Sequence, residues 1–139
     1  DQLTLLRSRP EYIPAAVQEM IRYEAPLPFF HRYASVDCEV MGISFPKGTK
    51  FGLLYGSANR DPQQFAAAHC FDITRSPNRH VAFGRGAHLC LGNNLARLNM
   101  ETVFSRLLAR TKTIELRESP RFRPGLASRG VSALAVALL

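Results

Sequence analysis

The sequence contains no tryptophan, only three lysines and no long apolar run. A transmembrane helix needs about 20 consecutive apolar residues, and the longest candidate, residues 132–139, is far shorter. We therefore expect no membrane segment in this chain. The first ten residues carry charged side chains and no apolar block, which predicts no signal peptide and a cytoplasmic location.

Cysteine is also scarce. The three cysteines, Cys38, Cys70 and Cys90, include no Cys-x-x-Cys pair, so support for a zinc site is weak. An odd number of cysteines without a signal peptide argues against a disulfide framework. The sequence therefore predicts a reduced intracellular protein in which Cys38 and Cys70 are small buried residues.

Positive charge comes almost entirely from arginine. Lysine and arginine together number 18 against 11 acidic residues, which gives a formal net charge of +7. A nucleic-acid surface combines a basic stripe with aromatic side chains, whereas these arginines are spread along the chain. Arginine pairs bidentately with carboxylates and other anions. We expect no nucleic acid as a partner, and we expect part of the basic excess to be paired with buried anions.

Length and hydrophobic content predict a single domain over residues 1–139, because 139 residues with 46% hydrophobic content can form a core. Helical spacing predicts two principal helices, residues 14–23 and 92–110. The second helix carries an apolar stripe with asparagine and arginine opposite, formed by Leu91, Leu95, Leu98, Val103 and Leu107. Strands are expected over residues 29–33, 38–41, 50–55, 114–116 and 131–138. With an irregular stretch over residues 59–83, the predicted fold class is α+β with small β-sheets.

The segment richest in chemistry is residues 83–92, Phe-Gly-Arg-Gly-Ala-His-Leu-Cys-Leu-Gly. Gly84 and Gly86 permit a sharp bend with positive φ, and Gly92, at the start of the second helix, lets a bulky group approach the backbone. A thiolate at a helix N-terminus is stabilised by the helix dipole and by unpaired N–H groups.

Three interpretations of Cys90 remain open from these residues alone. The first is a buried core cysteine beside an ordinary turn. The second is a catalytic nucleophile with His88 as its base, although one intervening residue makes direct activation awkward. The third is the axial thiolate of a heme iron, for which one cysteine suffices.

The pattern Phe-Gly-x-Gly-x-His-x-Cys-x-Gly resembles the heme-binding loop of the cytochromes P-450, the heme-thiolate monooxygenases. Six positions carry the resemblance: Phe83, Gly84, Gly86, His88, Cys90 and Gly92. It implies that these residues bind heme b (iron protoporphyrin IX), with Cys90 as the iron ligand. It also implies that the chain is the C-terminal portion of the family's mainly-α fold, of the soluble bacterial type, with a long irregular wrap and a cysteine loop.

Other segments support the same resemblance. Glu19 and Arg22 form a Glu-x-x-Arg pair, which in this family joins an arginine of the irregular stretch, here Arg75. The resemblance makes these three residues a buried structural network. It also assigns Arg32 and His88 to the two heme propionates. The segment Asn-Arg-Asp-Pro at residues 59–62 is a further family match.

The resemblance implies a monooxygenase that inserts oxygen into a small organic substrate. A ferredoxin-like or flavin redox partner would supply electrons at the proximal face of the heme, where Arg79, Arg85 and Arg97 are candidate docking residues. No segment matches the family's distal helix, so no catalytic residue is expected in this portion. The alternatives are a non-catalytic heme-binding module and a nonfunctional truncated remnant.

Overall fold

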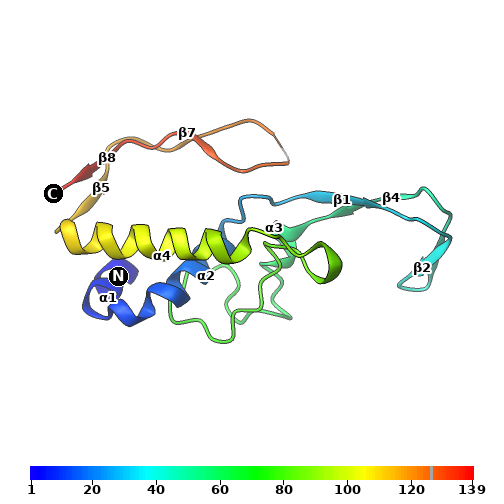
Figure 1. The fold of residues 1–139 in the computed structure, drawn as a ribbon, viewed down its shortest axis with the longest axis horizontal. Coiled ribbons are helices and arrows are strands. Elements are labelled where there is room, and N and C mark those ends of the chain that lie inside the picture. The colour runs from blue at the N-terminus through cyan, green and yellow to red at the C-terminus, as the bar shows by residue number, and fades with distance from the viewer. Residues whose placement is uncertain (126) are drawn as a thin grey trace.

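The structure is a computed structural model that describes residues 1–125 and 127–139. Its helices are α1 (Gln2–Ser8), α2 (Ile13–Tyr23), α3 (Tyr55–Ala58) and α4 (Asn93–Arg110), with the short 3₁₀ helices η1 (Pro10–Tyr12) and η2 (Gly86–His88). Helices α1, α2 and α4 form a helical body from which two strand ribbons extend (Figure 1).

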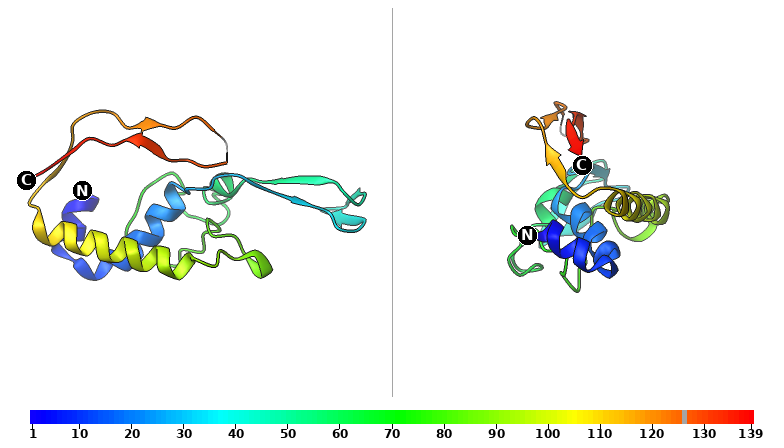
Figure 2. Two further views of the ribbon diagram at one scale, coloured as in Figure 1. Left: turned by 45° about the horizontal axis from the view of Figure 1, so that its top comes forward. Right: turned by 90° about the vertical axis from the view of Figure 1, so that its left-hand side faces the viewer.

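The strands in the described part of the chain form antiparallel pairs. We call residues 30–53 the arm. In the arm, β1 (Phe30–Tyr33) pairs with β4 (Lys50–Leu53), and β2 (Cys38–Val40) pairs with β3 (Ile43–Phe45) at its tip. In the C-terminal ribbon, which we define as residues 113–139, β5 (Ile114–Leu116) pairs with β8 (Val136–Leu138), and β6 (Arg121–Phe122) pairs with β7 (Val131–Ala133). The C-terminal ribbon stands off from the helices (Figure 2).

The core lies around α2. This helix buries Ile13, Val17 and Ile21, and Phe104 of α4 packs against the apolar clusters on both halves of it. The remaining side of the core is supplied by residues 59–85, which contain no helix or strand and which we call the strap. Ile73 and Ala82 of the strap are buried in these clusters.

The predicted fold class is confirmed: the structure is α+β, with α2 and α4 as its principal helices. The observed α2 and α4 begin one residue away from the predicted starts. Helix α1 was not predicted, although the Asp1 carboxylate caps it by accepting a hydrogen bond from the Thr4 N–H at 2.8 Å. Strands β3 and β6 were also missed, and Tyr55 begins α3 instead of ending a strand.

The predicted apolar stripe of α4 does not face the core. Leu91 is fully exposed, and Leu95, Leu98 and Val103 are each about 60% exposed. The face that packs on α2 instead carries Asn93, Arg97, Met100, Phe104 and Leu108. No described residue covers the leucine face. None of the helices in the described part of the chain combines the length and apolar character that a bilayer-spanning segment needs.

Candidate functional site

The cysteine loop, residues 83–92, is closed by its own backbone. Gly84 and Gly86 have φ values of 71° and 64°, the left-handed conformation that their lack of a side chain permits. The bend brings the Cys90 N–H to the carbonyl of Phe83 at 2.8 Å. The predicted sharp turn is therefore present, and it fixes the backbone on both sides of Cys90.

Cys90 itself is a free, exposed thiol, which excludes the interpretation as a core cysteine. Cys90 precedes Gly92, the N-cap of α4, by two residues. It therefore lies just before the helix N-terminus at which it was predicted. The Cys90 carbonyl accepts hydrogen bonds from the Asn93 N–H and side-chain amide, at 3.2 and 2.7 Å. A Cβ on Gly92 would meet nothing within 4 Å, so the space beside this backbone is open.

A pocket of about 230 Å³ opens beside the thiol. Five predicted site residues line it together: Arg32, Phe83, Gly84, His88 and Cys90. Gly86 and Gly92 shape the loop but do not line the pocket. The lining residues that the sequence did not indicate are Pro26, Leu27, Phe30, Tyr55 and Ala82. A proline-rich segment running into an apolar strand was the available signal for three of them.

The polar side chains of this pocket are available for a ligand. The Arg32 guanidinium donates to the adjacent His31 carbonyl at 2.9 Å and makes no ion pair with a described residue. The imidazole of His88 has no hydrogen-bond partner within the described residues. An exposed thiol, apolar walls and two side chains able to meet carboxylates fit heme, a flat apolar macrocycle with two propionates. A larger cavity of about 610 Å³ lies between η1 and α4 and contains no cysteine or histidine.

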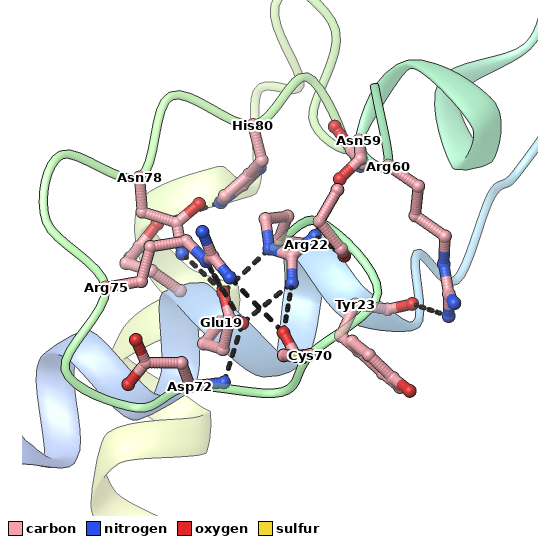
Figure 3. A network of polar contacts seen from close by, with 12 residues as sticks. Glu19, Arg22, Tyr23, Asn59, Arg60, Cys70, Asp72, Arg75, Asn78 and His80 are labelled. Carbon is pink, nitrogen blue, oxygen red and sulfur yellow. Dashed lines mark hydrogen bonds and ion pairs between the residues drawn. The ribbon is translucent and has the colours of Figure 1, made fainter. Parts of the chain in front are cut away.

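Glu19 and Arg22 lie in a second, closed cluster (Figure 3). Both are fully buried, and two parallel hydrogen bonds of 2.7 Å join the guanidinium to the carboxylate. Arg75 approaches the same carboxylate at 3.2 Å. The Asp72 N–H and the Asn78 side-chain amide complete its partners, at 2.9 and 3.0 Å. The structure thus brings the three predicted network residues together.

This cluster holds the strap against α2. Arg22 also donates to the carbonyls of Asn59, Ala68 and Cys70, so each of its five N–H groups has an acceptor. Arg75 donates to the carbonyls of residues 66, 67 and 70. The strap makes a few backbone hydrogen bonds of its own, in turns. The guanidiniums supply donors to buried carbonyls that these turns do not satisfy, such as those of Asn59 and Ala68.

Opposing influences act on the Glu19 carboxyl. Burial alone would raise the pKa of Glu19, but hydrogen bonds from Arg22, the Asp72 N–H and Arg75 outweigh it. The net result is a pKa below the usual value, so the carboxylate stays ionised.

His80 connects the strap to α2. Its Nε2 lies 3.0 Å from the Gln18 side-chain oxygen. Burial first, then the positive charges of Arg97 and Arg22, lower the pKa of His80 to about 4. The imidazole is therefore neutral at pH 7 and packs in the strap as an uncharged group.

Asn59 was matched only as part of a motif, yet it joins the network to the cysteine loop. It is fully buried, its carbonyl accepts from Arg22, and its side-chain oxygen accepts from the Val81 N–H at 2.8 Å. The backbone segment that leads to Phe83 is therefore fixed by the same cluster that fixes α2.

Two predictions about individual residues need correction. Cys70 is exposed and Cys38 is half-buried, because both lie on the outer surface of irregular or edge segments. Arg97 is not a free docking residue: it lies over the Phe83 ring at 5.1 Å and donates to Asn93 at 2.9 Å. Arg79 and Arg85 are exposed as expected.

Comparisons with known proteins agree with this geometry. The sequence matches the family described as Cytochrome P450 over residues 6–125. Cytochrome P450-terp from a Pseudomonas species is 47% identical over 87% of this chain and 28% of its own length. Linalool 8-monooxygenase of Pseudomonas putida is 41% identical over 100% of this chain and 34% of its own length.

The fold comparison gives the same family. The crystal structure of P450BioI in complex with hexadec-9Z-enoic acid ligated acyl carrier protein has a TM-score of 0.95 and 42% identity, over 99% of this chain and 36% of that one. The chain therefore spans about a third of the length of the relatives it matches.

Proposed function

This chain belongs to the cytochrome P450 family, and we therefore propose that residues 1–139 are the C-terminal, heme-binding portion of a monooxygenase. Cys90 supplies the axial thiolate in this proposal. The observation that carries it is the pocket in which an exposed thiol, free among the described residues, lies together with Arg32 and His88.

Each site residue has a distinct part in the proposal. Bound heme would supply activation of oxygen at a thiolate-ligated iron. The cysteine loop presents Cys90, and the clearance at Gly92 keeps the backbone from obstructing the macrocycle. Arg32 and His88 meet the two propionates, which would otherwise be buried without counter-charge. The network of Glu19, Arg22 and Arg75 holds the strap, and no residue of this portion takes part in substrate chemistry.

The partners belong to the proposal as well. We propose a small organic substrate and an electron donor, either ferredoxin-like or a flavoprotein, that approaches the face carrying the cysteine loop. Arg79 and Arg85 are the exposed arginines available there for an acidic partner. A cytoplasmic location remains a prediction.

The test is the optical spectrum of the reduced full-length protein with carbon monoxide. We expect the thiolate-type Soret band, its loss in Cys90→Ser, and its retention in Cys70→Ser, which changes another exposed thiol. A thiolate-type band that survives Cys90→Ser would overturn the assignment. We expect the isolated 139-residue chain to retain heme poorly, because it spans about a third of its relatives.

A further inference from the structure

Arg129 lies where the C-terminal ribbon meets the helical body. Its backbone N–H donates to the Pro26 carbonyl at 2.7 Å, and its guanidinium pairs with the carboxylate of Glu24. Within residues 1–125 and 127–139, every hydrogen bond or ion pair that links the ribbon to residues 1–111 involves Arg129. The other bonds at the edge of the ribbon close its base, where the Lys112 and Thr113 N–H groups donate to the Leu139 carbonyl. Away from that base, Arg129 makes the polar attachment of the described part of the ribbon to the helical body.

The partner carboxylate is also held from the strap. Arg60 lies 4.0 Å from Glu24, donates to the Tyr23 carbonyl at 2.7 Å and covers the Tyr23 ring at 4.3 Å. Glu24 is the C-cap of α2. Three segments that are distant in sequence thus meet at this carboxylate: the end of α2, the start of the strap and the C-terminal ribbon.

The contact reaches the wall of the pocket. Pro26, whose carbonyl accepts the Arg129 N–H, lines the pocket beside Cys90 together with Leu27 and Phe30. A shift of the ribbon would therefore be transmitted directly to this wall. The backbone bond and the ion pair act on residues 24 and 26, so they fix the chain just before the lining segment begins.

We propose that Arg129 is a positioning residue that, with Glu24, latches the C-terminal ribbon onto residues 26–30 and so sets the pocket wall beside Cys90. The strands of the ribbon contain no buried residue, so apolar packing does not duplicate the latch. The functional consequence rests on the proposed heme site, whereas the latch itself depends only on the contacts described here.

The latch is tested by hydrogen exchange in the full-length protein. Arg129→Gln and Glu24→Gln should each raise exchange about two- to fivefold in residues 127–133 and 27–34, the range expected for a partly exposed ion pair. The double variant should exceed each single variant by less than the sum of the two effects, because both substitutions remove the Arg129–Glu24 pair, while Glu24 also faces Arg60 and Arg129 also covers the Phe122 ring. Arg123→Gln is the matched control: Arg123 is exposed in the same ribbon, and its side chain has no partner among the described residues.

The pocket is tested with the same variants by optical titration with imidazole, a ligand of heme iron. A change of about twofold or more in its dissociation constant in Arg129→Gln and Glu24→Gln, but not in Arg123→Gln, supports the proposal. Unchanged exchange in both segments would overturn the latch. Faster exchange with unchanged imidazole affinity would overturn its effect on the pocket. Absence of a thiolate-type spectrum in the unmodified protein would instead overturn the proposed function, while the exchange result would still decide the latch.

Discussion

The network around Glu19 and the pocket beside Cys90 are linked by the same strap, yet they treat polar side chains in opposite ways. In the network, Glu19 and Arg22 are fully buried and every N–H of Arg22 has an acceptor. In the pocket, the thiol of Cys90 and the imidazole of His88 have no partner among the described residues. The difference separates groups that stabilise the fold from groups that are available to another molecule. We call the Glu19 network the closed region and the pocket beside Cys90 the open region.

The largest expected effect breaks the closed region. Glu19→Gln keeps the shape of the side chain but leaves the guanidiniums of Arg22 and Arg75 without a buried counter-charge. Removing one partner of a buried ion pair costs about 3–5 kcal/mol of unfolding free energy, which urea unfolding measures. Partly exposed Arg75, whose side chain is 9% accessible, can recover some hydration and moderates the loss.

Glu118→Gln is the control for that change. Glu118 forms an exposed pair with Arg121 at 3.5 Å, which is worth less than about 1 kcal/mol. Equal losses in the two variants would show that the Glu19 network does not stabilise the strap, and the contrast between the two regions would fail.

The next effect is a dependence of stability on pH that originates at His80 in the strap and at Glu19 in the closed region. The pKa of His80 is about 4 in the folded protein and about 6.5 in an unfolded chain. The unfolded state therefore binds the proton more tightly, and stability falls as the pH drops from about 6.5 to about 4. Below that window, protonation of Glu19 removes further stability, because its folded pKa lies below the usual value.

Urea midpoints measured from pH 7 to pH 4 check this dependence. We expect His80→Gln to flatten the decline over this range. His69→Gln, at an exposed position of the same strap, is the control and should leave the curve as in the unmodified protein. A steep decline that persists unchanged in His80→Gln would assign the pH dependence to other groups.

The fold could be predicted where local signals are strong. Pro14 lies in the first turn of α2 and Pro26 follows its end, and glycine and proline mark the hairpins of the arm, so these elements lie near their predicted positions. The orientation of α4 could not be predicted, because both of its faces carry periodic apolar residues. Leu98 and Phe104 are equally apolar, but only the face of Phe104 meets α2.

The candidate site shows the same division between local and tertiary information. The bend at Gly84 and Gly86 follows from local backbone chemistry, and the structure has it. The position of Arg97 over Phe83 depends on how α4 meets the cysteine loop, which no sequence spacing specifies. Tyr55 lines the pocket because α3 turns it toward the loop, and an isolated tyrosine after a strand gives no such signal.

The smallest expected effect on stability belongs to the open region. Arg32→Gln and His88→Gln should each change the unfolding free energy by less than about 0.5 kcal/mol. The His88 side chain has no hydrogen-bond partner among the described residues, and Arg32 loses only an exposed hydrogen bond to the His31 carbonyl and a contact with the Phe30 ring. Both should speed the loss of heme from the full-length protein to a heme-scavenging acceptor, since each removes a partner of a propionate. Arg79→Gln, an exposed change on the strap outside the pocket, should alter neither quantity. A loss of more than about 1 kcal/mol in the heme-free protein would make Arg32 or His88 structural, and the two regions would no longer differ in kind.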